Sequence, residues 1–522
     1  MSSVPPAPTG PALLTPADVD ALVEAMWQAA GATPAAAAGD AEFLRRVTLD
    51  AVGRVPTLDE AERFLANGAP DKRARLVDAL LASPEHADHA AGVAMDLLVG
   101  RQFRKPRLEK RLDPRAFFVE AFRANRPWDA MARDMLTFTG EILPSGAGVY
   151  LASHLRGGGP EAATAATARL FLGVQIQCAQ CHDHPTDARY KQEDFYGLVA
   201  YFGRTRAREE KIEGAPPMSG ADGKRYFVVE KPGAGKRVQA KFKPPGMGMG
   251  GEERVAAPRF FGRDIEPLRN ETPRETLARA VTGSELFAKA AVDRTWTELF
   301  GRGIVEPWDD LGGEGDPSHP ALLVRLADDF RASGYDLRHL LRILLLSRAY
   351  GLTSRSAPDA PDSAPAPFAR AAVRRLSPEQ LFRSLLVATG ADRAAPGGAA
   401  DDEVQKKIDR ALREYLYVFG DDEMAEVETF NGNIPQALLL FNGDVTNQGT
   451  RARPGSTLAA LLAATPDPAQ RLRRLYLTAY ARPPSDDEAA RLLPALAAST
   501  GPAAWEDVFF ALLTSTEMLT NH

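Results

Sequence analysis

Helix-start signals recur on both sides of one Gly- and Pro-rich stretch, and they restrict the fold more than any other feature of the sequence. Thr57 precedes one apolar segment, and Glu60 stands three residues further on. Ser377 and Gln380 repeat this arrangement before another segment. The hydroxyl accepts a hydrogen bond from a backbone N–H that a helix leaves unpaired, and the Glu or Gln side chain bonds back. Because the segments that follow carry apolar residues at three- and four-residue spacing, we expect a mainly α-helical protein.

The stretch from about 204 to 262 departs from this pattern. It is rich in Gly, Pro and Lys, and two short alternating runs at 225–230 and 237–243 predict a small β-hairpin. Residues 1–14 are rich in Pro and Ala and are expected to be disordered. The sequence therefore predicts two helical domains separated by a small β-containing insertion. The expected parts are a disordered N-terminal segment with the first helix (1–39), a helical domain (40–203), the insertion (204–262) and a C-terminal helical domain (263–522).

The composition argues against nucleic acid and membranes as partners. The 522 residues carry a formal net charge of -6 and an isoelectric point near 5.9, so no basic excess attracts nucleic acid or anionic lipid. No apolar run approaches the roughly 18 residues of a transmembrane helix, so we expect no transmembrane segment. The N-terminus also lacks the charged and apolar regions of a secretory signal, which makes the cytoplasm one expected location.

Two distant segments of the sequence repeat one another. Residues 44–65 and 472–493 match at many positions at a constant offset of 428 residues, including Arg54 with Arg482. Both segments predict a helix, a tight Arg-x-Pro corner and a capped second helix. Two similarly built helical hairpins explain this repeat better than any functional symmetry.

Both cysteines of the chain lie in Cys178-Ala179-Gln180-Cys181-His182. This C-x-x-C-H pattern is typical of covalent haem c attachment, in which two thiols bind the haem vinyl groups and the adjacent histidine is the proximal iron ligand. The spacing matters because both thioethers must reach one porphyrin edge while the imidazole lies against the iron. A haem-binding or electron-transfer protein is the first functional hypothesis.

Three other interpretations of the same residues stay open. A redox-active cysteine pair needs only the two thiols, with His182 lowering a thiol pKa. A purely structural role needs only small buried thiols and local histidine hydrogen bonds. A non-haem site for a Zn, Fe or Cu ion, either in an enzyme or in an interaction scaffold that the metal stabilises, would draw on nearby donors. These candidate ligands are Cys178, Cys181, His182, Asp183, His184 and Asp187.

A haem would also need apolar surroundings and, in many proteins, a sixth ligand. Met247 and Met249, in the glycine-rich stretch 246–251, are the candidate distal ligands, and an open five-coordinate iron is equally compatible. Histidine alternatives are His86, His89 and His154. Apolar residues that could wall a pocket, although they are more often ordinary core, are Leu170, Phe171, Leu172, Ile176, Phe195, Tyr196, Tyr201 and Phe202.

Other clusters carry less information. An acidic group in a Gly-rich loop is better explained by solvated and capping carboxylates than by a cation site. Its members are Glu306, Asp309, Asp310, Glu314 and Asp316. The sequence contains no nucleophile-elbow, Walker, dinucleotide or H-E-x-x-H motif, so whether the protein is an enzyme stays undecided.

The chain resembles a known pair of bacterial domains of unknown function, described as planctomycete cytochrome-like proteins. Residues 43–57, 71–89, 167–187 and 192–202 resemble the first domain. Residues 293–350, 431–443 and 512–522 resemble the second.

The resemblance implies an exported or periplasmic, cytochrome-like protein. It also implies an unidentified redox partner, or a small-molecule or polysaccharide substrate. Two features depart from the family pattern: no export signal is visible, and Asp293 stands where the family favours Asn.

Overall fold

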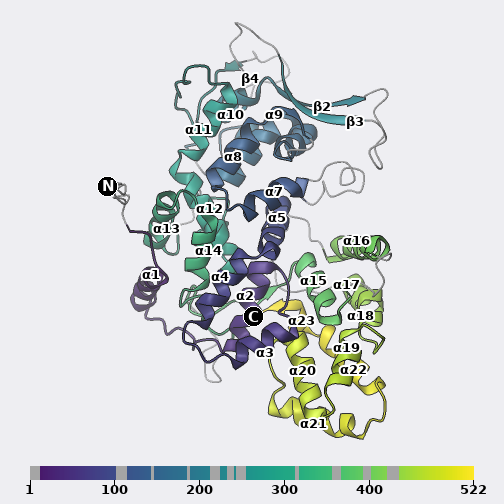
Figure 1. Cartoon of the computed structure of the whole chain (residues 1–522). Coiled ribbons are helices and arrows are strands. Elements are labelled where there is room, and N and C mark those ends of the chain that lie inside the picture. The colour runs from purple at the N-terminus through teal and green to yellow at the C-terminus, as the bar shows by residue number, and fades with distance from the viewer. Residues whose placement is uncertain are drawn as a thin grey trace, which may run out of the picture. The chain divides into compact units, whose positions relative to one another are not determined.

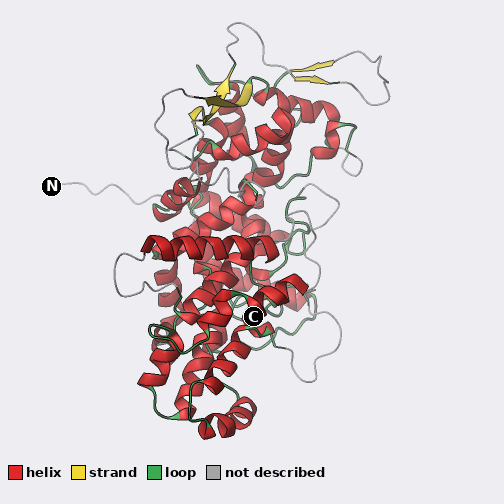
Figure 2. Cartoon of the chain, turned by 90° about the vertical axis from the view of Figure 1, so that its right-hand side faces the viewer, coloured by secondary structure: helices red, strands yellow, loops and turns green. Residues whose placement is uncertain are grey.

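The computed structural model describes most of the chain. The described residues are 12–100, 114–142, 146–184, 189–211, 224–231, 240–242, 254–311, 317–355, 366–391, 401–419 and 434–522. Helices dominate these residues, as Figure 2 shows, so the prediction of a mainly α-helical protein is confirmed.

The chain forms two compact units, and each unit combines two separate stretches of sequence (Figure 1). The first unit comprises Met1–Ala30 and Ala87–Ser347, and the second comprises Gly31–His86 and Arg348–His522. The sequence-based division at 203 and 262 stays a prediction about domains. Of the expected disordered segment, residues 1–11 lie outside the described residues, whereas Leu14 is buried and its N–H donates to Asp329 Oδ1 at 2.6 Å. Disorder at Leu14 was therefore wrong, because its side chain enters the apolar core.

The described residues of the first unit form helices and short strands, and its longest helix, α9, is kinked at Gly159. Its helices are α1 (Pro16–Ala29), most of α5 (Pro84–Leu98), α7 (Pro114–Arg123), α8 (Trp128–Thr137), α9 (Val149–Leu172), the 3₁₀ helix η2 (Gln177–Gln180), α10 (Gln192–Phe202), α11 (Pro273–Thr282), α12 (Glu285–Phe300), α13 (Pro320–Ala332) and α14 (Leu337–Leu345). Its strands are β1 (Gly140–Glu141), β2 (Thr205–Lys211), β3 (Lys224–Glu230), β4 (Ala240–Phe242) and β5 (Arg254–Ala256).

The second unit is built almost entirely from short helices. Its helices are α2 (Asp40–Val52), α3 (Leu58–Ala66), α4 (Lys72–Ala82), α15 (Pro378–Thr389), α16 (Asp401–Phe419), α17 (Ile434–Asn442), α18 (Asp444–Gly449), α19 (Thr457–Ala464), α20 (Pro468–Tyr480), α21 (Asp486–Ala498), α22 (Ala503–Leu513) and α23 (Thr516–Leu519). Two-residue strands β6 (Arg374–Arg375) and β7 (Thr520–Asn521) pair antiparallel. Its core joins both stretches of the unit, since Leu49 of α2 belongs to the same apolar cluster as Leu385, Trp505 and Phe509.

The strands β2 to β5 lie between 204 and 262, as expected, but their pairing corrects the sequence prediction. β3 pairs with β2 and β1 in an antiparallel sheet of order β1-β3-β2, and β4 pairs with β5. The predicted hairpin between 225–230 and 237–243 is therefore wrong. The completely buried Val228 faces Ala207 on one side and Gly140 on the other, and these small partners leave room for its side chain. Because most residues of β2 are charged, hydrophobic alternation did not mark it as a strand.

The two repeated segments form matching corners within the second unit, so the predicted helix-corner-helix geometry is confirmed. The first helix ends in a left-handed residue in each case, Gly53 with φ 74° and Ala481 with φ 61°. The arginine that follows binds the glutamate of the next capping box: Arg54 binds Glu60 at 2.8 Å and Arg482 binds Glu488 at 2.7 Å.

Each corner arginine also binds a second carboxylate. Arg54 reaches Glu85 at 2.6 Å, and Arg482 reaches Glu517 at 2.7 Å. The hydrogen bond from Arg482 is the main cause that lowers the pKa of Glu488 to about 2. Each corner is therefore fixed by one guanidinium that bridges two carboxylates.

Asp293 is a buried carboxyl group in α12, at the position where the resembled family favours Asn. Its Oδ1 accepts hydrogen bonds from the backbone N–H groups of Ile304 at 2.6 Å and Val305 at 3.2 Å. Its buried Oδ2 has no hydrogen-bond partner in the described structure. Burial is the main cause that raises its pKa to about 7, and it outweighs the two hydrogen bonds that favour the carboxylate.

We predict that Asp293→Asn makes protein stability less dependent on pH. Because the pKa is raised in the folded state, the stabilising contribution is complete below the unfolded value near 4. It is lost as the pH rises through about 7. The variant should therefore be more stable than the wild type at pH 8, by ~4 kcal/mol at most, with a smaller difference at pH 5. Urea unfolding at several pH values measures this. The exposed Asp328→Asn is the matched control, and parallel pH profiles for Asp293→Asn and wild type would contradict the assignment.

We also predict opposite effects for reciprocal substitutions at the two corners. Gly53→Ala should destabilise the protein by about 1 kcal/mol, since a Cβ is disfavoured in the left-handed region. Ala481→Gly should stabilise it by about 0.5 kcal/mol, since relief of that strain exceeds the added chain entropy. Urea unfolding tests both. Gly68→Ala serves as control, because a Cβ at Gly68 meets no atom within 4 Å. Equal losses for Gly53→Ala and Gly68→Ala would refute the strain argument.

Candidate functional site

The C-x-x-C-H motif lies on an exposed turn between two helices of the first unit. Gly173 ends α9 in the left-handed conformation with φ 62°, and η2 then carries Cys178. The N–H of Cys181 donates to the carbonyl of Cys178 at 3.4 Å, which closes the turn. Both cysteines are exposed and neither forms a disulfide. The two thiols are therefore accessible from solvent on one short turn.

His182 is exposed directly after the second thiol, and its hydrogen bond fixes which ring nitrogen is protonated. Its Nδ1 lies 2.7 Å from the carbonyl oxygen of Asp183. A carbonyl oxygen only accepts hydrogen bonds, so Nδ1 carries the hydrogen. The neutral ring then keeps a lone pair on Nε2. Such an Nδ1–H bond to a carbonyl is a common feature of histidines that bind a metal through Nε2.

His184 is held in the opposite way. Its Nε2 lies 3.0 Å from the carbonyl oxygen of Gln175, so this nitrogen carries the hydrogen. Its backbone N–H donates to the carbonyl of Tyr190 at 2.9 Å, and its ring packs edge-on against Tyr190. In His182 the Nε2 atom therefore keeps its lone pair, whereas in His184 the Nε2 atom donates its hydrogen to a backbone carbonyl.

Gln192, the first residue of α10, fastens the motif to that helix. Its side-chain amide donates to the carbonyl of Gln180 at 3.1 Å. Its backbone N–H donates to Oδ1 of Asp183 at 3.0 Å. Asp183 therefore satisfies one of the N–H groups that the start of a helix leaves unpaired. Gln192 itself is buried, so the turn is held from inside the protein while the thiols face outward.

Asp309 supports the segment that leads into the motif. Its carboxylate accepts hydrogen bonds from Gln175 at 2.7 Å and from Arg169, and only 4% of the residue is exposed. The expectation of solvated carboxylates in this loop was thus wrong for Asp309, because Arg169 and Gln175 replace its water. Glu314 and Asp316 lie outside the described residues.

The apolar residues proposed as pocket walls are mostly part of the ordinary core. Phe171 stacks on Phe287 and contacts the rings of Trp128 and Tyr150. Six other members of that set are also buried, whereas Tyr196 is half-buried. These buried residues are Leu170, Leu172, Ile176, Phe195, Tyr201 and Phe202.

The remaining candidate ligands divide into two groups. Asp187, Met247 and Met249 lie outside the described residues. His86 binds the carbonyl of Ala51 at 2.8 Å within the second unit, and the half-buried His154 binds the carbonyl of Leu98 at 2.9 Å within the first.

Among the described residues, no group of three or more His, Cys, Asp or Glu side chains is arranged to hold a metal ion. Within the same part of the chain, no helix has the length and hydrophobicity that crossing a bilayer requires.

Sequence reasoning identified the thiols and His182 but missed the residues that hold them. Gln175 and Gln192 carry no motif of their own, and Asp309 stands more than a hundred residues away in sequence. The only local signal was the position of Gln192 at the start of an expected helix.

Comparison with known proteins covers both halves of the chain. Residues 18–207 match PSCyt2, a "Protein of unknown function (DUF1549)", and residues 273–496 match PSD1, a "Protein of unknown function (DUF1553)". No curated protein and no solved structure shows significant similarity. The two matches occur in the order expected from the resemblance, and the chain therefore belongs to the family of paired planctomycete-type domains of unknown function.

Proposed function

We propose that Cys178, Cys181 and His182 form the attachment site of a c-type haem, and that the protein is an electron-transfer protein. The observation that carries this proposal is the ring orientation of His182. Its Nδ1 donates to a backbone carbonyl and its Nε2 keeps a lone pair, directly beside two exposed thiols without a disulfide. These are the donors that covalent haem attachment needs, in the order that it needs them.

The surroundings of the motif also support this role. Gln192 bonds to Gln180 and Asp183, which lie on either side of the second thiol and His182. The turn is therefore fixed at both ends of the Cys181-His182 pair, and neither residue needs to be drawn out of a packed core to meet a ligand. When bound, a haem of this type exchanges single electrons with a redox partner, and its solvent exposure is one determinant of the reduction potential.

A dithiol redox pair is the second candidate, and one specific observation favours it. Both thiols are exposed, free and three residues apart, which is the arrangement of a cysteine pair that cycles between dithiol and disulfide. In this case His182 would be an adjacent base and not a metal ligand. The two candidates differ in whether the cysteines are alkylated by haem or remain titratable thiols.

A third candidate, a Zn, Fe or Cu site, depends on donors that already have other partners. Asp183 uses Oδ1 for Gln192, and His184 uses Nε2 for the carbonyl of Gln175. The experiments below distinguish this metal site from the haem site and from the dithiol pair.

We predict that a covalent chromophore depends on both cysteines. The full chain, fused to an export leader and produced with haem-attachment machinery, should retain haem under denaturing conditions. Cys178→Ala and Cys181→Ala should each lose one thioether link and retain far less haem, and the double variant should retain none. Absorption spectra and haem staining after denaturing electrophoresis measure this, with the exposed Gln177→Ala on the same turn as control. Wild type without covalent haem under these conditions would sink the cytochrome proposal. Two titratable thiols that disappear on oxidation would then support the dithiol pair.

We further predict that the two histidines respond differently. His182→Ala should keep the covalent attachment but change the Soret and Q bands, since the axial ligand is lost. His184→Ala should leave the spectrum unchanged, since its Nε2 serves the carbonyl of Gln175. If the spectrum changes only in His184→Ala, the ligand assignment is wrong. A colourless protein with stoichiometric Zn, Fe or Cu that is lost in His184→Ala would instead favour the metal site.

A further inference from the structure

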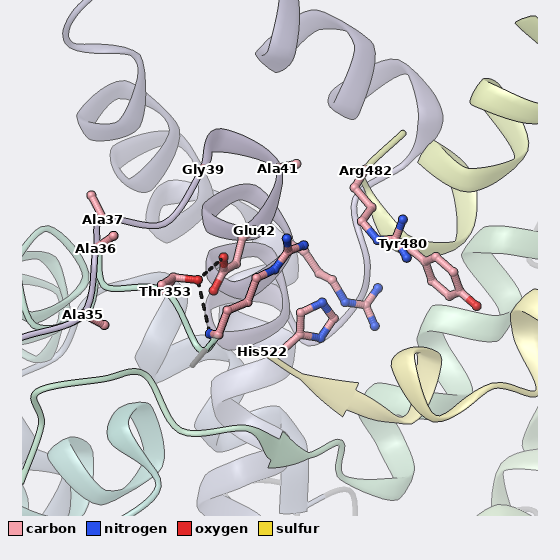
Figure 3. Close-up of a pocket in the computed structure, with 12 residues that line it drawn as sticks. Ala35, Ala36, Ala37, Gly39, Ala41, Glu42, Thr353, Tyr480, Arg482 and His522 are labelled. Carbon is pink, nitrogen blue, oxygen red and sulfur yellow. Dashed lines mark hydrogen bonds between the residues drawn. The ribbon is translucent and has the colours of Figure 1, made fainter. Parts of the chain in front are cut away.

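The second unit contains a cavity of about 470 Å³, which lies within the range typical of small-molecule sites. Its walls come from four separate parts of the sequence, represented by Glu42, Thr353, Tyr480 and His522 (Figure 3). The alanine-rich segment 35–37 and Ala41 form an apolar side, and Arg45, Arg355 and Arg482 contribute positive charge. The family matches assign no role to any of these residues.

Glu42 has the one acidic side chain among the described residues that line the cavity, and this carboxylate is already satisfied. Glu42 Oε1 accepts from Arg46 at 2.7 Å and from the N–H of Ser354 at 2.8 Å. Its Oε2 accepts from the hydroxyl of Thr353 at 2.8 Å, a bond drawn in Figure 3. The charge of Glu42 is therefore balanced by Arg46, which does not line the cavity.

Three arginines line the cavity, and two of them, Arg482 and Arg355, differ in their partners. Arg482 is neutralised by Glu488 and Glu517, the corner carboxylates. The side chain of Arg355 is exposed and, within the described parts of the chain, forms no hydrogen bond or ion pair. Arg355 is therefore a cation at the cavity with its full hydrogen-bonding capacity available.

Arg45 is a buried cation without a carboxylate partner among the described residues. Its guanidinium donates to four backbone carbonyls: Ala479 at 3.0 Å, Glu517 at 2.9 Å, Met518 at 3.4 Å and Thr520 at 3.2 Å. Its Nε has no partner there either. Burial is the main cause that lowers its pKa to about 10, so the charge persists at neutral pH. Its field reaches the cavity, and it contributes to the low pKa of His522, which burial chiefly lowers to about 4.

Among the described side chains, the charges therefore leave an excess of positive potential at the cavity. Four arginines, with Arg46 included, face three glutamates, and His522 is neutral at physiological pH. Arginine binds carboxylate, phosphate and sulfate groups through paired N–H donors. The hydroxyl of Tyr480 is engaged by Leu512 and Ser515, so it is not available as a donor for a ligand.

We propose that this cavity binds a small organic molecule that carries a carboxylate, phosphate or sulfate group. Arg355 contacts the anionic group directly, and the buried charge of Arg45, which also lines the cavity, attracts it. The alanine side of the cavity contacts an apolar part of the molecule, and its volume exceeds what a single inorganic ion would fill. The site is independent of the cysteine turn, which belongs to the first unit.

The test uses the full chain with sodium acetate, phosphate and sulfate as probes, each titrated at constant ionic strength against chloride. Isothermal titration calorimetry should show binding of at least one probe to wild type, and the preferred probe identifies the anionic group. Arg355→Gln should weaken that binding tenfold or more, which corresponds to about 1.4 kcal/mol. Arg473→Gln is the matched control, because Arg473 is also exposed and without a partner among the described residues, but does not line the cavity.

Each outcome of this experiment decides the proposal. Binding that is retained in Arg473→Gln and weakened in Arg355→Gln supports it. Equal affinities in the two variants would show that the anion binds elsewhere, and no binding of any probe to wild type overturns the proposal. Circular dichroism of both variants establishes that they are folded, which is expected because both side chains are on the surface.

Discussion

A chain folded into many helices must satisfy the carbonyl oxygens at its helix ends, and buried arginines do so at three of the described ends in this protein. The last four carbonyls of a helix have no partner within it, and burying them unpaired costs free energy. Within the second unit, Arg45 binds the carbonyl of Ala479 in the last turn of α20. Within the first unit, Arg274 binds the carbonyl of Leu136 near the end of α8, and Arg294 binds that of Leu170 near the end of α9. Arginines of neighbouring segments thus complete the helices within each unit.

Local sequence was enough to predict the helices, because a capping box lies within four residues. Thr57 with Glu60 and Ser377 with Gln380 marked true helix starts. The repeated Arg-x-Pro corner could be predicted for the same reason. Strand pairing could not be predicted, because β3 pairs with a charged segment, β2, and with the two-residue β1, and neither shows hydrophobic alternation. The hydrogen bonds from arginines to distant carbonyls could not be predicted either. Every residue has a backbone carbonyl, so the sequence does not indicate which one an arginine binds.

The candidate sites show the same division between local and distant information. A five-residue motif revealed Cys178, Cys181 and His182, because the chemistry itself fixes their spacing. The supporting contacts of Gln192 and Asp309 depend on how the chain folds back, so no pattern predicted them. The cavity of the second unit brings together residues more than four hundred positions apart, and only the folded unit places them in one wall.

The exposed turn that carries both thiols makes the protein sensitive to oxidation. Both cysteines are exposed and free, and thiolates on exposed surfaces react readily with oxidants and with each other. Two cysteines per molecule permit not only dimers but longer chains of cross-linked molecules. The exposure of both cysteines therefore makes the protein prone to covalent oligomerisation in oxidising surroundings.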